Sequence, residues 1–474
     1  MDRVLLQGFE WYLPEDASHW KRLGERAADL KEAGITAVWM PPAYKGANGC
    51  QDVGYGVYDL YDLGEFEQKG SIATKYGTKE EYLQAIEALH REGIEVVADI
   101  VLNHKMGADG CENVRVEAVN ETNRNQIIGR DEISAWTTFC FPGRNRKYSD
   151  FCWNHTHFDG VDWDDRKKRN QIFQFEGKEW DGEVDTENGN YDYLMGADLD
   201  MNNSEVVEEL KRWGEWYIQM TDIDGVRLDA VKHICFTFFT DWLSCLRQRT
   251  GRELWAVGEY WSPKLESLLH YIEKSGEVMS LFDVPLHFHF MQASVGNGNF
   301  DMSKIFEGTL TQAKPNLAVT FVDNHDTQPG QALQSWVEPW FKPLAYALIL
   351  LRKEGTPCVF YGDYYGIPHD GILPMQNVID RLLKVRKEMD DAGQQDYLDD
   401  PNIIGWVRKQ NERCCAVVMS DSVGGTKKML VGEAFLGQRF ADVLGNCKEE
   451  VEIGADGYGT FPVEGGSVSV WKAI

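Results

Sequence analysis

The sequence lacks a long apolar run. Its most apolar stretch, residues 344–351, is far shorter than the roughly 18 residues that a membrane-spanning helix requires. Residues 1–10 show no charged segment followed by an apolar one, so the sequence gives no indication of a secretory leader. These absences argue against a membrane protein and predict that the chain works in the cytoplasm.

Basic residues are scarce relative to acidic ones. There are 48 Lys and Arg against 76 Asp and Glu, which gives a formal net charge of -28. Such a surface repels nucleic-acid phosphates and anionic lipid headgroups, so neither nucleic acid nor a membrane surface is expected as a partner. The charge suits a neutral substrate or a bound cation, and much of it serves solubility.

The ten cysteines include no Cys-x-x-Cys pair. A structural zinc site is therefore not expected, and neither is a metal-dependent hydrolase with an open, His-rich zinc site. Without a leader pattern, the cysteines are expected to be reduced thiols in the cytoplasm.

What the sequence does contain is a regular alternation of short β-rich runs with amphipathic segments. The 474 residues, of which 43% are hydrophobic, suffice for two to four domains. Strands are expected at residues 5–11, 36–40, 95–102, 225–230, 254–259, 279–284, 318–322 and 358–361. Helices are expected at 18–33, 79–91, 205–220, 236–249, 265–274, 302–311, 342–352 and 377–389. Eight such units predict a (β/α)8 TIM barrel, with a six-stranded open sheet as the alternative.

Two segments depart from this alternation. The stretch 105–204 is polar and aromatic without a helical period, and it is too long for a loop, so it is expected to be an inserted domain after the third strand. Residues 393–474 contain short strands separated by Gly-rich turns, which predict a C-terminal antiparallel β-sandwich. The barrel would then comprise residues 1–104 and 205–392.

Three carboxylates follow barrel strands at the end where TIM barrels carry their active sites. They are Asp229, Glu259 and Asp326. Converging carboxylates suit glycosidic-bond cleavage, in which one acid protonates the leaving oxygen and another carboxylate attacks the sugar. Arg227 lies on the same strand face as Asp229 and would keep it ionised. His104 and His325 can donate hydrogen bonds to sugar hydroxyls.

Four ordered segments, residues 99–104, 225–233, 258–261 and 321–326, resemble the four motifs of the α-amylase family of glycoside hydrolases. Further long matches, at residues 7–12, 52–66 and 188–195, are similar to the liquefying bacterial α-amylases, so that the resemblance covers nearly the whole chain. It implies a retaining endo-hydrolase of α-1,4 bonds in starch, glycogen and maltodextrins. A maltooligosaccharide-producing amylase or a transglycosylase of the same family is the alternative. A non-catalytic glucan-binding protein would be expected to lack one of the three carboxylates.

The resemblance also implies roles for individual residues. Asp229 would be the nucleophile, Glu259 the acid and then the base, and Asp326 a group that binds and distorts the sugar. Arg227, His104 and His325 would support them, and the sugar subsites would include Lys232, His233, Tyr55 and Trp261.

The inserted segment is rich in aspartate, a preferred ligand of calcium. The resemblance implies a main Ca2+ site formed by Asn103, Asp192, Asp198 and the backbone carbonyl of His233. Further metal ions, including Na+ in an adjacent site, would lie near Asp159, Asp181 and Asp200. Gly196 departs from the family, whose liquefying members usually carry an aromatic residue there, near the cleft and the metal. The partner is expected to be an α-glucan, and the chain a monomer.

Overall fold

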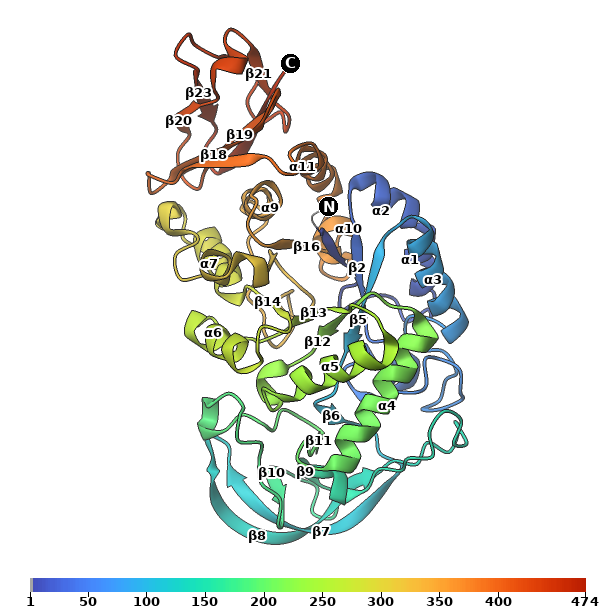
Figure 1. The fold of residues 1–474 in the computed structure, drawn as a ribbon. Helices are drawn as coiled ribbons and strands as arrows, with labels where there is room; N and C mark the ends of the chain where they lie inside the picture. The colour runs from blue at the N-terminus through green and yellow to red at the C-terminus, as the bar shows by residue number, and fades with distance from the viewer. Residues whose placement is uncertain (1–2) are drawn as a thin grey trace.

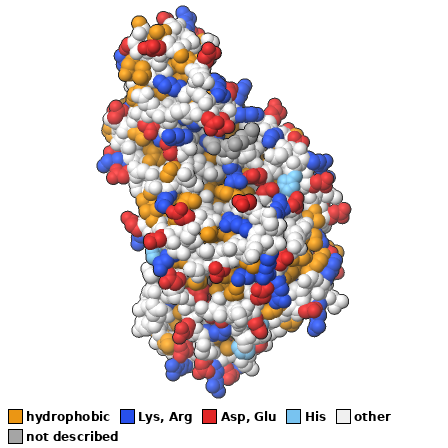
Figure 2. Space-filling model, in the orientation of Figure 1, with side chains coloured by type: hydrophobic (Ala, Val, Ile, Leu, Met, Phe, Trp, Pro, Cys, Tyr) orange, Lys and Arg blue, Asp and Glu red, His pale blue; other side chains and the backbone are white. Residues whose placement is uncertain are grey.

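The computed structural model describes residues 3–474, so Met1 and Asp2, at the start of the predicted barrel segment, lie outside the described residues. Three parts follow one another along the molecule: a β domain near the C-terminus, a central barrel and a second sheet at the opposite end (Figure 1). Acidic and basic side chains alternate over the face shown in Figure 2. Within residues 3–474, no helix is long and apolar enough to cross a membrane.

The central part is a closed barrel of eight parallel strands, which confirms the predicted TIM barrel and excludes the open sheet. The strands are β1 (Leu5–Gln7), β2 (Ala37–Met40), β5 (Glu95–Ile100), β12 (Gly225–Leu228), β13 (Trp255–Gly258), β14 (Ser280–Phe282), β15 (Ala318–Phe321) and β16 (Thr356–Phe360). The barrel closes because β1 pairs with β2 on one side and with β16 on the other. Nearly every strand residue is buried, as expected for a parallel sheet covered on both faces.

Helices surround the barrel (Figure 1). The longer ones are α1 (His19–Glu25), α2 (Ala27–Ala33), α3 (Lys79–Arg91), α4 (Ser204–Thr221), α5 (Phe238–Thr250), α6 (Leu265–Lys274), α7 (Val284–Val295), α9 (Lys342–Leu351) and α11 (Gln376–Glu388). Helix α3 is capped at its N-terminus by Thr78, which forms a reciprocal capping box with Glu81.

Three helix predictions differ from the structure. The single helix expected at residues 18–33 is divided into α1 and α2 at Arg26, which serves as the C-cap of one and the N-cap of the other. The helix expected at 302–311 is wrong: a 3-10 turn, η5 (Met302–Lys304), and the one-turn helix α8 (Leu310–Ala313) occupy that segment. Helix α7 was not predicted because most of its sides are apolar, which hides the helical period.

The inserted segment forms a six-stranded sheet in the order β6-β11-β9-β10-β7-β8. Its strands are β6 (His104–Lys105), β7 (Gly110–Asn120), β8 (Asn123–Thr138), β9 (Phe158–Asp164), β10 (Arg169–Phe175) and β11 (Ala197–Leu199). The long hairpin β7–β8 curves around the outer edge of the molecule (Figure 1). Strand β6 follows the barrel strand β5 closely and pairs with β11, so that Asp198 lies opposite His104. This pairing attaches the inserted sheet to the mouth of the barrel.

The C-terminal part is antiparallel, as predicted. It contains β17 (Gly393–Tyr397), β18 (Ile403–Gln410), β19 (Arg413–Ser420), β20 (Gly425–Leu430), β21 (Arg439–Asp442), β22 (Val451–Glu452), β23 (Tyr458–Val463) and β24 (Ser467–Ala473). A six-stranded sheet and the β20–β23 pair enclose a separate core that includes Met429, Phe461 and Trp471. Trp406 connects this part to the barrel, because its indole N–H donates to the carbonyl of Leu351 at 3.2 Å.

Candidate active site

A cavity of about 360 Å³ lies at the C-terminal ends of the barrel strands. It is lined by Trp11, Tyr55, His104, Tyr191, Leu194, Met195, Asp229, Ala230, Lys232, His233, Glu259, Trp261, Asp326, Gln331, Ala332 and Leu333. All the predicted catalytic and sugar-binding residues line it except Arg227 and His325, which are buried. The structure therefore brings the three carboxylates together with their predicted surroundings.

Arg227 is the buried centre of this arrangement. Its Nη1 donates to Asp229 Oδ1 at 2.6 Å and to Asp99 Oδ1 at 3.0 Å, and its Nη2 donates to Glu259 Oε2 at 2.9 Å. The strand register explains this geometry, because Arg227 on β12 lies opposite Asp99 on β5 and Val257 on β13. One guanidinium thus joins carboxylates from three neighbouring strands.

The carboxylates outnumber the cation that they share. Burial raises the pKa of Glu259 to about 7, with Arg227 opposing the effect and the charge of Asp229 adding to it. Burial also raises the pKa of Asp99 to about 6 and the pKa of Asp326 well above its ordinary value. Because these groups lie close together, their protons are shared within the cluster, and the site holds carboxyl protons near neutral pH.

Asp99 belongs to the site although the sequence did not single it out. Its Oδ2 accepts hydrogen bonds from Tyr55 OH at 2.8 Å and Trp39 Nε1 at 3.0 Å, while its Oδ1 binds Arg227. This carboxylate orients both the guanidinium and an aromatic ring of the cavity. A usable signal was present, because Asp99 lies near the C-terminal end of barrel strand β5.

His325 supports Asp326 from beneath the cavity. Its Nδ1 lies 2.9 Å from Gln7 Nε2, and its Nε2 lies 3.1 Å from Asp326 Oδ2. Burial and the charge of Arg227 lower the pKa of His325 well below its ordinary value, so the ring is neutral. His104 also lines the cavity, and its Nε2 lies 2.8 Å from the carbonyl oxygen of Tyr55.

Aromatic rings form one wall of the cavity. Tyr55 is stacked on His325 with ring centroids 5.0 Å apart, and Trp11 is stacked on Tyr55 at 6.1 Å. Trp261 packs against His287 and lines the cavity from the end of β13. Flat apolar faces beside polar groups suit sugar rings, which have apolar faces and hydroxyl edges. Trp11 was not assigned from the sequence, although it follows the first barrel strand.

Lys232 and His233 connect the barrel to the inserted segment. Lys232 Nζ donates to Glu187 Oε2 at 3.1 Å and to the carbonyl of Trp261 at 3.2 Å. His233 Nδ1 lies 2.7 Å from the carbonyl oxygen of Tyr191, and burial lowers its pKa to about 3, so it is neutral. Both side chains therefore hold the insertion against the cavity wall.

Next to the cavity, the structure groups Asp159, Asp192 and Asp198. Each offers a carboxylate oxygen, and these oxygens lie within 4.8 Å of one another. Both oxygens of Asp159 and Oδ2 of Asp198 are buried without a hydrogen-bond partner among residues 3–474. Burial raises the pKa of Asp159 to about 10, and the charges of neighbouring aspartates add to this effect. Buried carboxylates without donors fit a bound cation, which would supply the missing charge.

The other predicted metal ligands have different surroundings. Asn103 lies at the cluster, with its Nδ2 3.2 Å from Asp198 Oδ1. Asp181 accepts hydrogen bonds from Asn202 Nδ2 at 2.8 Å and Cys235 N at 3.2 Å, and Asp200 forms an ion pair with Lys178. The structure thus places Asp181 and Asp200 near the cluster but outside the group of three carboxylates.

Gly196 lies outside the catalytic cavity. It lines a second cavity of about 380 Å³, together with Met106, Trp136 and Trp163. Its φ of +65° favours glycine, and a Cβ there would lie 2.7 Å from the carbonyl oxygen of Lys105. A side chain at this position would therefore require the β6 backbone to move. Because Met195 lines the first cavity and Gly196 the second, the two cavities are neighbours.

Comparison with known proteins agrees with this geometry. Residues 15–413 match the family described as "Alpha amylase, catalytic domain", and residues 416–472 match "Alpha-amylase C-terminal". An "Alpha-amylase" of Geobacillus stearothermophilus is 57% identical over 99% of this chain and 86% of its own length. A "Glucan 1,4-alpha-maltohexaosidase" of Bacillus sp. (strain 707) is 53% identical over 99% and 92%. A "Cytoplasmic alpha-amylase" of Escherichia coli (strain K12) is 45% identical over 99% and 98%.

The Arg227 arrangement predicts a large loss of stability in Arg227→Met. The substitution leaves three buried carboxylates without their shared cation, which costs about 3–5 kcal/mol of unfolding free energy. Differential scanning calorimetry of the full chain measures the effect. Adding Asp99→Asn removes one uncompensated carboxylate and should recover part of the loss. Arg439→Met breaks an exposed ion pair with Glu450 and serves as the control, with a change of about 0.2–1 kcal/mol. Equal changes in the two single variants would contradict this role.

Proposed function

The chain belongs to the α-amylase family of glycoside hydrolases and hydrolyses internal α-1,4 bonds of starch, and from that premise we propose that Asp229, Glu259 and Asp326 carry out the reaction. The observation that carries the proposal is the guanidinium of Arg227, which joins Asp229 and Glu259 at the floor of the cavity. It gives the two carboxyl groups a fixed relative position and different environments. Such a pair can divide the roles of nucleophile and acid.

In the proposed mechanism Asp229 attacks the anomeric carbon. Arg227 orients its carboxylate through a 2.6 Å charge-assisted hydrogen bond. Glu259, whose pKa burial raises to about 7, gives its proton to the leaving glycosidic oxygen as the bond to the sugar breaks. In the second half, Glu259 takes a proton from water while the water oxygen displaces Asp229 from the sugar. Two inversions at the same carbon give net retention.

The remaining residues bind and orient the glucan. Asp326, with His325 beside it, is placed to accept hydrogen bonds from sugar hydroxyls and to favour a distorted ring. Tyr55 and Trp261 offer ring faces for stacking, and His104 contributes hydrogen-bonding groups. Lys232 and His233 lie on the side of the cavity formed with the insertion, where they contact further glucose units.

We propose that the acidic cluster binds Ca2+. Asp159, Asp192 and Asp198 supply the hard oxygen ligands that calcium prefers, with the Asn103 amide and the His233 carbonyl completing the site. The ion would hold the insertion on the barrel and take no part in bond cleavage. Additional ions, Na+ among them, would use Asp181 and Asp200, whose charges already act on Asp159.

We also propose a substrate range, a location and an oligomeric state. Starch-like glucans, including glycogen and maltodextrins, are the substrates, and the chain acts in the cytoplasm as a monomer. The cytoplasmic relative from Escherichia coli supports the location. The alternative is a maltooligosaccharide-producing amylase or a transglycosylase of the same family. The maltohexaosidase relative fits it, as does the second cavity with Trp136 and Trp163, but the α-amylase relatives support the main proposal better. The product lengths from soluble starch separate the two.

Asp229→Asn tests the nucleophile. The amide cannot attack the anomeric carbon, so kcat on soluble starch should fall by at least about 10⁴-fold. The fold should survive, because the amide oxygen can still accept a hydrogen bond from Arg227. Reducing-end release measures the rate, and the anomer formed by the unmodified chain is followed by NMR or polarimetry. Asp456→Asn, an exposed site on the C-terminal domain, is the matched control with unchanged activity. Retained activity in Asp229→Asn, or a β-anomeric product, would rule out the proposed mechanism.

The pH dependence tests Glu259 as the acid. Since the acid must carry its proton, and burial raises its pKa to about 7, kcat/KM on starch should decline as pH rises through about 7. Glu259→Gln should be inactive on starch. It should still release dinitrophenolate from an activated maltooligoside in a first turnover, because that leaving group needs no proton. The rate of this burst in Glu259→Gln should not fall as pH rises through about 7. If it does fall, the group that titrates near pH 7 is another carboxyl of the cluster and not Glu259.

Metal removal tests the calcium site. Saturating Ca2+ at about 100 times Kd adds about 2.7 kcal/mol to the unfolding free energy, so a chelator should lower Tm and restored Ca2+ should raise it. Mg2+ should restore less, because it demands a tighter octahedral site. Asp198→Asn should weaken the response, whereas Asp456→Asn should retain it. A Tm that is the same with chelator and with Ca2+ would argue against the site.

A further inference from the structure

Two cysteines of the inserted segment face each other across an isolated antiparallel bridge. Phe139 and Trp153 exchange both backbone hydrogen bonds, at 3.0 and 2.9 Å. The next opposed residues are Cys140 and Cys152, which therefore form a non-hydrogen-bonded pair. In such pairs the Cα atoms lie about 4.5 Å apart with the side chains close together, within the range of about 4.4–6.8 Å that a disulfide spans.

Both thiols are open to solvent. Cys140 is exposed and Cys152 is partly exposed, whereas four of the ten cysteines, Cys358, Cys414, Cys415 and Cys447, are buried. Burial raises the pKa of Cys140 to about 11, and the neighbouring Cys152 thiol adds to this effect. Both thiols follow the Phe139–Trp153 bridge on opposed segments, and a small reagent can reach them from solution.

We propose that Cys140 and Cys152 form a reversible disulfide by exchange with a small-molecule disulfide such as oxidised glutathione. The thiolate of one cysteine attacks a glutathione sulfur, which forms a mixed disulfide and releases one glutathione thiolate. The second cysteine loses its proton and attacks the protein sulfur of the mixed disulfide, which releases the second glutathione. Two protein thiols are oxidised, and one glutathione disulfide is reduced to two thiols.

The disulfide would close the base of a loop, residues 141–151, whose backbone is unusually constrained. Phe141, Asn145, Arg146 and Tyr148 all adopt positive φ, between 49° and 74°. Conformations of this kind persist in non-glycine residues only where the surroundings hold them. A cross-link at the base would reduce the number of conformations open to this loop in the unfolded chain. It would therefore stabilise the folded conformation with its positive φ angles.

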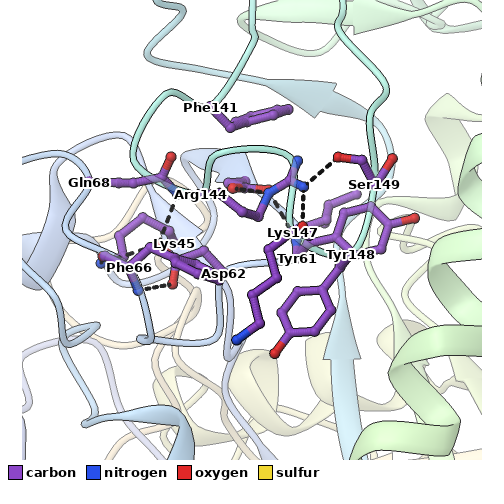
Figure 3. Close-up of polar contacts among 12 residues, drawn as sticks. Lys45, Tyr61, Asp62, Phe66, Gln68, Phe141, Arg144, Lys147, Tyr148 and Ser149 are labelled. Atoms are coloured by element: carbon purple, nitrogen blue, oxygen red, sulfur yellow. Dashed lines mark hydrogen bonds and ion pairs between the residues drawn. The ribbon is translucent and has the colours of Figure 1, made fainter.

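In the reduced protein, Arg144 holds the loop. Its Nε donates to Asp59 Oδ2 at 2.8 Å. Its Nη1 donates to the carbonyls of Lys147 and Ser149 at 2.5 and 2.8 Å (Figure 3). On the outer side, Tyr148 OH donates to Glu65 Oε2 at 2.8 Å. These contacts fix the tip of the loop, but they do not link the two segments at its base that carry Cys140 and Cys152.

The base of the loop also packs around Lys105, which directly follows His104 of the catalytic cavity. The Lys105 ammonium lies 5.7, 5.4 and 4.9 Å from the ring centroids of Phe139, Phe141 and Trp153. Neither cysteine lines the catalytic cavity. The disulfide would therefore stiffen the support behind His104 without obstructing substrate.

The test is oxidation of the full chain with oxidised glutathione at about pH 8.5, where more thiolate is present than at neutral pH. Remaining thiols are alkylated, and peptides are mapped by mass spectrometry. The expected product joins the peptides of Cys140 and Cys152, with the loss of two hydrogens, and reverts with dithiothreitol. Calorimetry should show a Tm higher by roughly 2–4 °C in the oxidised form.

Matched variants distinguish the proposal from general thiol oxidation. Cys140→Ser and Cys152→Ser should each retain a glutathione adduct on the remaining cysteine and lose the gain in Tm. Cys111→Ser removes another exposed thiol of the inserted sheet and should leave both the link and the gain intact. The proposal is overturned if no Cys140–Cys152 link forms, or if the oxidised Cys140→Ser variant gains as much stability as the unmodified chain.

Discussion

The active site depends on one buried cation that several acids share. Arg227 has lost its water and is compensated only because Asp99, Asp229 and Glu259 approach it from three strands. The acids in turn would be difficult to ionise without it. This mutual dependence makes the strand register a chemical requirement, since a shift of one residue would turn Arg227 to the other face of β12. The closed barrel provides the rigidity that holds this register.

The acidic cluster of the insertion presents a similar electrostatic problem with a different solution. In the barrel, the chain supplies its own cation, Arg227, and no bound ion is needed to balance the buried carboxylates. In the insertion, both oxygens of Asp159 are buried without donors in the described part of the chain, and the pKa of that carboxyl is raised to about 10. The first site is complete as folded, whereas the carboxylates of the second fit a cation taken from solution, as proposed above.

The sequence was sufficient for the parts of the molecule that follow simple periodicity. Eight apolar strands with intervening amphipathic helices predicted the barrel, and carboxylates at the strand ends predicted the cavity. Helix α7 was missed because it is apolar on most sides, and the helix expected at 302–311 failed because its apolar residues fold as separate short turns. The position of Asp99 near a strand end was a usable signal, but its contact with Arg227 depends on the register between strands far apart in sequence. The proposed domain boundaries and the assignment of individual metal ligands remain predictions.

The junction between barrel and insertion joins the two electrostatic sites. Asn103 and His104 leave the barrel after β5, and on β6 His104 pairs with Asp198 of the acidic cluster. Asn103 faces the cluster, while His104 lines the catalytic cavity. Neighbouring residues on one short segment thus contact both sites. The next residue, Lys105, is held by three aromatic rings and by the carbonyl of Tyr58. The geometry of the cavity is consequently set by the barrel register on its floor and by the packing of the insertion on its wall.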